Sequence, residues 1–332
     1  MSEQSSKRWA WVRRVLNWAC LILVPVLLYL LLRNQDWGEV WQGLRTYRWT
    51  TLALGGAIAL VSYGVFSAFD LIGKRYTGHT LDKSRVMQIA FVCYAFNLNL
   101  SSWVGGIALR YRLYGKRGVK VSTVTRILSL GLLTNWSGYL LVAGVLFAAG
   151  LPPLPASVEL GSAGLRLIGV AMVVAVVIYL AACRFSRKRS WQLKGHEVTL
   201  PSFSMAALQV ASGALNWALM GSLMFLLLPQ GVSFPTVLAI LLISSIAGVI
   251  AHIPAGLGVL ETVFITLLQG QYGKGALLAS LIAYRALYFL LPLAIACIGY
   301  LFLERRVLTQ AMPDEPKGGA EAKDAPEHQR SR

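Results

Sequence analysis

The longest uncharged stretch of this chain runs from Val198 to Leu260 and contains no Asp, Glu, Lys or Arg. A helix needs about 20 consecutive apolar residues to cross a ~30 Å hydrocarbon layer, so this stretch is long enough for more than one crossing. The whole chain is 56% hydrophobic, with a mean hydropathy of +0.60, which is more apolar than soluble domains are. The sequence therefore predicts an all-α polytopic membrane protein. A β-barrel would show short alternating segments instead.

Apolar runs follow one another with short linkers between them. We predict a single integral membrane domain over residues 1–311, followed by a disordered cytoplasmic tail over 312–332 that is rich in Ala, Pro, Lys and Glu. The apolar runs are Leu16–Leu32, Thr50–Ile72, Val86–Leu100, Trp103–Leu113, Val121–Ala149, Gly164–Cys183, Phe203–Leu228, Pro235–Ala251, Gly256–Leu268 and Gly275–Leu303.

The net charge of +17 lies mostly in short loops beside these runs. In a soluble protein this charge would indicate nucleic-acid binding, but here the positive-inside rule explains it better. Placing the loops Gly73–Arg85, Arg110–Lys120 and Arg184–Lys194 in the cytoplasm puts both termini there as well. We therefore predict a multi-pass protein of the bacterial inner membrane with cytoplasmic N- and C-termini and no nucleic-acid partner. The few basic residues left outside are Arg33, Arg45, Arg48, Arg166 and Lys274.

Two look-alike interruptions break the apolar pattern, one at Ser101–Arg110 and one at Ala251–Glu261. The arms around the first break are each too short to span a bilayer alone. If the segment dips in and returns, the basic loops on either side of it stay in the cytoplasm. We predict six transmembrane helices plus two re-entrant helical hairpins; the alternative is eight full spans. The units, about 50–150 and 203–303, would then be inverted repeats, and broken segments at matching places indicate a transport site.

The tips of the predicted hairpins are rich in glycine. Non-helical backbone at membrane depth is tolerated only inside protein or against a water-filled cavity. Backbone N–H groups at the start of a half-helix can hold an anion such as a phosphate, and glycine lets a head group approach closely. The alternative is that these glycines serve only close helix packing. The candidate glycines are Gly105, Gly106, Gly256 and Gly258.

Three arginines and one glutamate near the hairpins are the charged candidates. Arg110 follows the first tip, whereas Arg126 and Arg285 lie in the helices after the two hairpins. A guanidinium offers a planar fork that suits a phosphate, so we predict that the three bind an anionic lipid head group. Glu261 follows the second tip, and charges inside a membrane usually face a partner or a cavity, so it could pair with an arginine, carry a proton or meet a cationic head group. A structural ion pair is the alternative role for Glu261, and an interfacial position is the alternative for Arg110 and Arg126.

The polar candidates beside the tips are Asn97, Asn99 and Ser101 at the first and His252 at the second. They would hydrate a cavity, although a lone histidine more often has a structural hydrogen bond. Asp70, near the cytoplasmic end of its span, is expected to pair with Lys74. We find no paired carboxylates, metal-ligand spacing or phosphate-binding loop, and we therefore predict no enzyme activity, no metal and no cofactor.

Several strings of residues resemble a known family. They are Asn97–Ile107 with Arg110–Tyr114, Ser244–Ile250, His252–Gly256, Gly258–Glu261 and Ala283–Arg285. The chain is similar to inner-membrane proteins related to the flippase-like transmembrane region of lysylphosphatidylglycerol synthases. The resemblance implies a lipid-handling membrane protein. The synthases add a cytoplasmic aminoacyl-transfer domain that we do not expect here, so aminoacylation does not carry over. The lipid varies in the wider group and does not carry over either.

These observations leave two main functional hypotheses. The first is a phospholipid flippase or transporter that moves or binds an anionic (glycero)phospholipid. The second is a non-transporting membrane partner or regulator of a phospholipid-synthesising enzyme, which the basic loops would dock. A membrane-embedded lipid-modifying enzyme is a weaker third, because no acid–base pair for it is found.

Overall fold

The computed structural model describes residues 37–100, 102–152, 161–193, 196–251 and 258–311. Helices make up nearly all of this part of the chain. One short antiparallel hairpin pairs β1 (Ser190–Leu193) with β2 (His196–Thr199). The helices are α2 (Trp37–Arg45), α3 (Trp49–Thr77), α4 (Lys83–Asn99), α5 (Leu109–Gly115), α6 (Val121–Ala148), α7 (Gly161–Phe185), α8 (Phe203–Leu227), α9 (Phe234–Ala251), α10 (Val259–Leu268), α11 (Lys274–Arg285) and α12 (Leu291–Ala311), with π-helical segments η1 (Ser102–Ala108) and η3 (Ala286–Leu290).

Six helices in the described part of the chain are long and apolar enough to cross a membrane. Five of them match predicted spans: α3, α6, α7, α8 and the continuous rod from Lys274 to Leu303. The sixth is α9, which has 18 residues and which the sequence assigned to the first arm of the second hairpin. The predicted span Leu16–Leu32 and the predicted tail 312–332 lie outside the described residues. The structure therefore confirms an all-helical polytopic membrane protein.

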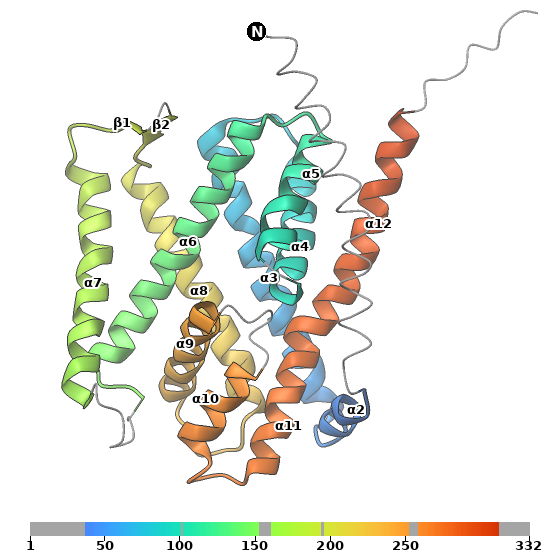
Figure 1. Ribbon diagram of the computed structural model, residues 1–332, viewed down its shortest axis with the longest axis vertical. Helices are drawn as coiled ribbons and strands as arrows, with labels where there is room; N and C mark the ends of the chain where they lie inside the picture. The colour runs from blue at the N-terminus through green and yellow to red at the C-terminus, as the bar shows by residue number, and fades with distance from the viewer. Residues whose placement is uncertain (1–36, 101, 153–160, 194–195, 252–257, 312–332) are drawn as a thin grey trace, which may run out of the picture.

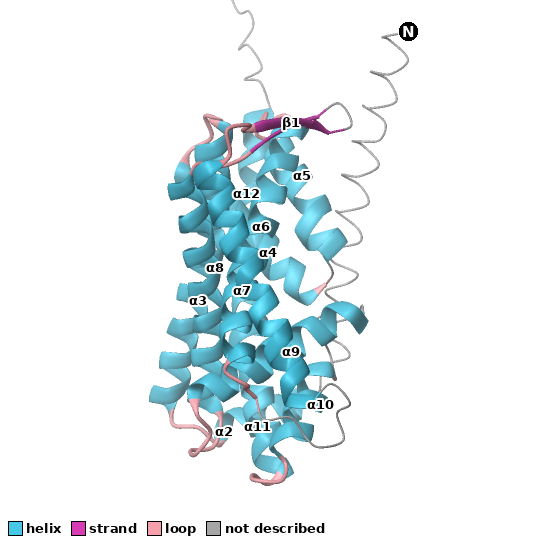
Figure 2. Ribbon diagram, turned by 90° about the vertical axis from the view of Figure 1, so that its left-hand side faces the viewer, coloured by secondary structure: helices cyan, strands magenta, loops and turns pink. Residues whose placement is uncertain are grey.

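Two helical hairpins point toward each other from opposite ends of the molecule (Figures 1 and 2). In the first, α4 descends from the end that carries β1 and β2, and η1 and α5 return to that end. In the second, α9 rises from the opposite end, and α10 returns there. Within each hairpin the two arms are in contact. These opposed directions are the ones expected for inverted repeats. Insertion of the hairpins into a bilayer stays a prediction.

Helix boundaries follow from local chemistry. α3 ends at Gly78, whose φ of 67° lies in the left-handed region that favours glycine. The Asp82 carboxylate then accepts from the Ser84 N–H and caps α4, and Ser202 caps α8 in the same way through the Met205 N–H. These caps fix where the first hairpin and the second unit begin.

Glycine lets the long helices pack backbone against backbone. A Cβ on Gly138 of α6 would lie 2.1 Å from the carbonyl carbon of Gly213 in α8, and one on Gly169 of α7 would lie 2.3 Å from the Ala148 nitrogen. Only glycine fits at such a distance, as is common where helices pack in membranes. α6 is therefore held closely against both α7 and α8.

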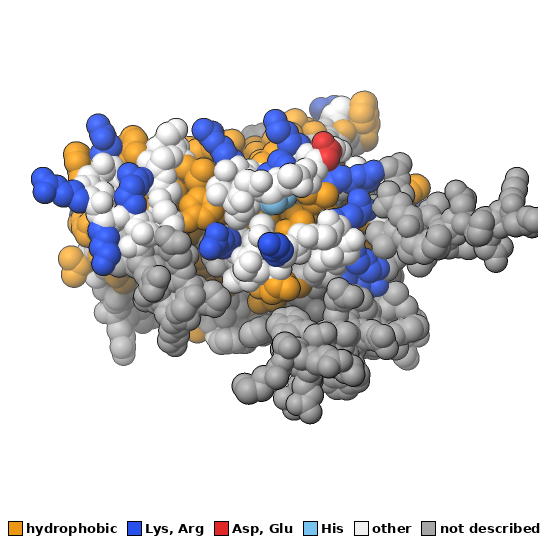
Figure 3. All heavy atoms as spheres, turned by 90° about the horizontal axis from the view of Figure 1, so that it is seen from above, with side chains coloured by type: hydrophobic (Ala, Val, Ile, Leu, Met, Phe, Trp, Pro, Cys, Tyr) orange, Lys and Arg blue, Asp and Glu red, His pale blue; other side chains and the backbone are white. Residues whose placement is uncertain are grey.

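Many exposed basic side chains gather on one end of the molecule (Figure 3). This is the end of β1 and β2, where the loops α3–α4, α5–α6 and α7–α8 meet (Figure 1). The three basic loops predicted to be cytoplasmic therefore share one end. The described basic residues with exposed or half-exposed side chains in these loops and adjoining turns are Lys74, Arg75, Lys83, Arg85, Lys116, Arg117, Lys120, Arg184, Arg187, Lys188 and Arg189.

Candidate functional site

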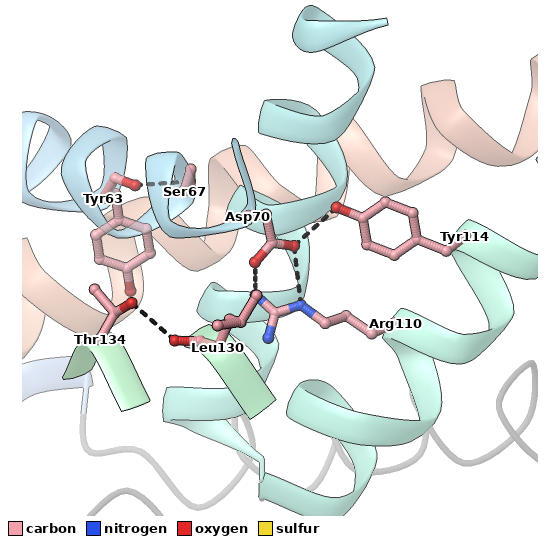
Figure 4. A network of polar contacts seen from close by, with 7 residues as sticks. All are labelled: Tyr63, Ser67, Asp70, Arg110, Tyr114, Leu130 and Thr134. Atoms are coloured by element: carbon pink, nitrogen blue, oxygen red, sulfur yellow. Dashed lines mark hydrogen bonds and ion pairs between the residues drawn. The ribbon is translucent and has the colours of Figure 1, made fainter. Parts of the chain in front are cut away.

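A buried ion pair joins the first hairpin to α3 (Figure 4). Arg110, at the start of α5, donates from Nε and Nη2 to the two carboxylate oxygens of Asp70, at 3.2 and 2.9 Å. The Tyr114 hydroxyl donates to Asp70 as well, at 2.8 Å. The Asp70 side chain is fully buried and that of Arg110 is 8% exposed. Burying two charges is costly unless the geometry is good and the remaining lone pairs are satisfied, and this fork-to-carboxylate contact meets both conditions.

This arrangement corrects the expected pairing of Asp70 with Lys74. The Lys74 ammonium instead donates to the backbone carbonyls of His79, at 2.8 Å, and Leu81. Lys74 lies one helical turn after Asp70, nearer the helix end, and its long side chain reaches the loop beyond Thr77. Asp70 is thereby left to the hairpin, and Lys74 closes the α3–α4 loop.

His79 lies in that loop, beside the ion pair. Its ring makes an edge contact with Tyr114, at 6.2 Å between centroids. Neither ring nitrogen reaches solvent or a hydrogen-bond partner among the described residues. Burial and the neighbouring Lys74 charge lower the pKa of His79 below its ordinary 6.5, and the charge of Asp70 opposes them.

We expect stability to fall as the pH drops below 6.5, the ordinary pKa of His79. In that range His79 is protonated in the unfolded chain but still neutral in the folded protein. Proton binding therefore favours the unfolded state. The loss should level off below the lowered folded-state pKa. Melting temperatures in detergent across this range should show a slope that His79→Gln reduces. An unchanged slope in His79→Gln would contradict this assignment.

A second ion pair lies at the start of the returning arm of the second hairpin. Arg285, the last residue of α11, donates from Nε and Nη2 to the Glu261 carboxylate in the first turn of α10, at 2.5 and 2.9 Å. The Arg285 guanidinium also lies 5.7 Å from the centroid of the Phe289 ring. The side chains are 12% and 23% exposed, so this pair is more accessible than the first.

The two ion pairs occupy matching places in the hairpins. Arg110 and Glu261 each stand one residue after a leucine, Leu109 or Leu260, in the arm that leaves the tip. Each binds a helix that flanks its own hairpin. Both hairpins are therefore held by a bidentate Arg–carboxylate contact of the kind that is strong and directional.

The structure places the glycines of the first tip in close packing. A Cβ on Gly105 would lie 2.1 Å from the Asn97 nitrogen, and one on Gly106 would lie 2.8 Å from the Asn97 side-chain oxygen. These contacts favour the packing role that the sequence left open. Gly258 has a φ of 80° and immediately precedes α10, with nothing within 4 Å of an added Cβ. Gly256 lies outside the described residues.

The remaining candidates do not all gather at the ion pairs. Asn99 is buried and bonds two backbone carbonyls, whereas Asn97 is half-buried against Gly105 and Gly106. Arg126 lies at an exposed position of α6, away from the described members of either ion pair. Ser101 and His252 fall outside the described residues.

A buried cluster of hydroxyl groups joins the two units, and the sequence analysis missed it. The Tyr288 hydroxyl contacts those of Ser62, at 2.9 Å, and Tyr94, at 3.1 Å, while Ser62 also donates to Asn216. Tyr284 stacks on Tyr288 with centroids 5.5 Å apart. The spacing of Tyr284 and Tyr288, four residues apart on one helix face, was the available signal. Of the partners on three other helices, Asn216 gave a signal as an amide inside an apolar run, whereas Ser62 and Tyr94 gave none.

Arg112 is a second residue that the sequence analysis did not single out. It is buried, 4% exposed, and donates to the hydroxyl of Tyr300 on α12 at 2.7 Å. The first hairpin is therefore fastened by arginines on two sides, to α3 through Arg110 and to α12 through Arg112. Among the described residues, no group of three His, Cys, Asp or Glu side chains could hold a metal ion.

Comparison with known proteins places this architecture in a family. Residues 17–296 match the model of the lysylphosphatidylglycerol synthase TM region. The chain is 45% identical over 303 residues to inner membrane protein YbhN of Escherichia coli (strain K12), covering 91% of this chain and 95% of that protein. It is 28% identical over 270 residues to an uncharacterized protein, slr0712, of Synechocystis sp., covering 80% and 84%. The chain belongs to the lysylphosphatidylglycerol synthase transmembrane-region family and is a multi-pass inner membrane protein.

Proposed function

We propose that this protein moves an anionic glycerophospholipid between the leaflets of the inner membrane. The observation that carries the proposal is the pair of hairpins that approach each other from opposite ends, each held by an Arg–carboxylate contact beside its tip. Opposed hairpins in inverted repeats offer a site near mid-membrane that each side can reach in turn. Membership of a family named for the transmembrane region of a phospholipid synthase supports a lipid substrate.

Arg285 is the better candidate for the head-group ligand. Both arginines bind their carboxylate through Nε and Nη2, but Asp70 is fully buried whereas Glu261 is 23% exposed. A lipid phosphate presents the same two-oxygen face to a guanidinium as a carboxylate does. We infer that the phosphate replaces Glu261 on Arg285, while Asp70–Arg110 keeps the other hairpin closed.

If one hairpin stays closed while the other opens, no continuous channel forms across the membrane. Parting a buried Arg–carboxylate pair costs several kcal/mol unless another charge takes over. A bound anionic head group supplies that charge to Arg285 and releases Glu261. The substrate would thus lower the barrier to its own passage, and the bilayer would stay sealed without it.

Replacing Arg285 should abolish most lipid movement. We expect Arg285→Ala to slow the exchange of labelled phosphatidylglycerol between the leaflets of proteoliposomes by about tenfold or more, which corresponds to the loss of a charge-assisted hydrogen bond. Arg166→Ala, at an exposed position of α7, should leave the rate unchanged. Equal rates for wild type, Arg285→Ala and empty liposomes would refute lipid movement.

The regulatory alternative has its own observation, the basic end of the molecule (Figure 3). A protein that only docked a phospholipid-synthesising enzyme would use this surface and not the hairpin tips. Co-purification of such an enzyme that is lost on replacing Arg187 and Lys188, but unaffected by Arg285→Ala, would favour this second function.

A further inference from the structure

The helix that carries Arg285 changes its winding immediately after that residue. α11 ends at Arg285, and the next five residues form η3 before α12 begins. The Leu291 N–H donates to the Ala286 carbonyl, five residues back. Such π-helical turns are rare inside helices and occur often at functional sites. The wider turn changes the direction in which Arg285 points relative to α12.

Two side chains from the first unit bind the carbonyls of this turn. The Tyr63 hydroxyl of α3 donates to the Tyr288 carbonyl at 3.0 Å. The Asn99 amide of α4 donates to the Phe289 carbonyl at 3.2 Å and to its own-helix carbonyl of Ala95 at 2.8 Å. Tyr63 and Asn99 are 0% and 4% exposed. Pro292 has no N–H, so a regular helix would leave the Tyr288 carbonyl without its usual donor, and a buried carbonyl without a donor is costly. The Tyr63 hydroxyl supplies that donor at the widened turn, and Asn99 adds a second bond at Phe289.

The π turn determines where the Arg285 guanidinium lies. One residue of an α-helix corresponds to about 100° of rotation, so rewinding η3 as regular helix would turn Arg285 relative to α12. In the observed form, Arg285 meets Glu261 and lies over the Phe289 ring. Tyr63 and Asn99 of the first unit are thus connected to the Arg285–Glu261 pair through their hydrogen bonds to η3.

We propose that Tyr63 and Asn99 are positioning residues for Arg285, holding η3 in its π form so that the guanidinium faces Glu261 and any head group that replaces it. The head-group part rests on the proposed function; the orientation of Arg285 does not. The arrangement also couples the two units, because Asn99 lies at the end of α4, next to the first tip.

The test measures how readily Arg285 itself reacts. Purified full-length protein is treated with phenylglyoxal, which modifies arginine, and the rate at Arg285 is followed by mass spectrometry, with exposed Arg166 as the internal reference. Tyr63→Phe and Asn99→Leu should each raise the Arg285 rate about fivefold, the equivalent of one hydrogen bond. Tyr63→Phe removes only a hydroxyl, so it keeps the test usable if Asn99→Leu does not fold.

Tyr139→Phe is the matched control. Its hydroxyl is also buried and donates to a backbone carbonyl of the other unit, Leu242 at 3.1 Å, but away from η3. It should leave Arg285 reactivity unchanged. An Arg285 rate that is unchanged in Tyr63→Phe, or that rises equally in Tyr139→Phe, would overturn the positioning role.

Lipid exchange in proteoliposomes separates this proposal from the proposed function. Wild-type protein that moves no lipid refutes the function, and the reactivity of Arg285 then decides its positioning alone. If wild type moves lipid, Tyr63→Phe should slow it about fivefold, with Tyr139→Phe near wild type. Normal exchange in a variant with raised Arg285 reactivity would overturn the link between positioning and transport.

Discussion

Arg110→Met should destabilise the folded protein by about 3–5 kcal/mol, the usual cost of removing one partner of a buried ion pair. The substitution leaves the Asp70 carboxylate fully buried, with the Tyr114 hydroxyl as its one remaining side-chain donor among the residues that the structure describes. Because Arg110 begins α5, the returning arm of the first hairpin would also lose its attachment to α3. Unfolding by denaturant in mixed micelles measures the free-energy difference.

The double variant Asp70→Leu/Arg110→Met is the informative control. With both charges removed, no unpaired carboxylate remains, and replacing a buried pair by apolar residues is often neutral. We expect the double variant to recover most of the stability that Arg110→Met loses. Tyr114→Phe alone should cost about 1 kcal/mol, the typical net value of one hydrogen bond. Equal loss in the single and double variants would show that the pair does not stabilise the fold as argued.

Gly105→Ala should be the second severe substitution, at about 3 kcal/mol or more, the upper end of the cost of overpacking a core. The added methyl would lie 2.1 Å from the nitrogen and 2.6 Å from the Cα of Asn97, and 2.2 Å from the Phe96 carbonyl carbon. These are backbone atoms, so no side chain can move aside. The two arms of the first hairpin would have to separate.

Gly64→Ala provides the comparison within the same protein. Gly64 lies inside α3 with nothing within 4 Å of an added Cβ. Alanine has the higher helix propensity there, so this variant should fold at least as well as wild type. The measurement is the yield and thermal stability of monodisperse protein in detergent. A stable Gly105→Ala protein with wild-type lipid exchange would contradict the tight hairpin.

Patterns along the chain predicted the helices and their interruptions well. Long apolar runs predicted α3, α6, α7, α8 and the rod from Lys274 to Leu303 because a helix in lipid must satisfy its backbone internally. Loop charge predicted that the basic loops share one end. The family resemblance was confirmed by the match over residues 17–296.

The candidate site was predicted only in part. Glu261 and Arg285 were both singled out, and the structure joins them. Arg110 was singled out without its partner Asp70, 40 residues away, and Arg126 was included although its side chain is exposed. An arginine in an apolar segment shows that a partner is needed, but its spacing from the tip does not show which helix supplies that partner.

By itself, the sequence determined the helical segments, the glycine-rich breaks and the basic end, because each depends on residues close together in the chain. Only the tertiary structure decided that Asp70 binds Arg110 and not Lys74, and that Tyr63, Asn99 and the turn after Arg285 meet. These contacts depend on how the two units pack against each other. The position of a hydroxyl or carboxylate in an apolar run does not indicate which helix will pack against it.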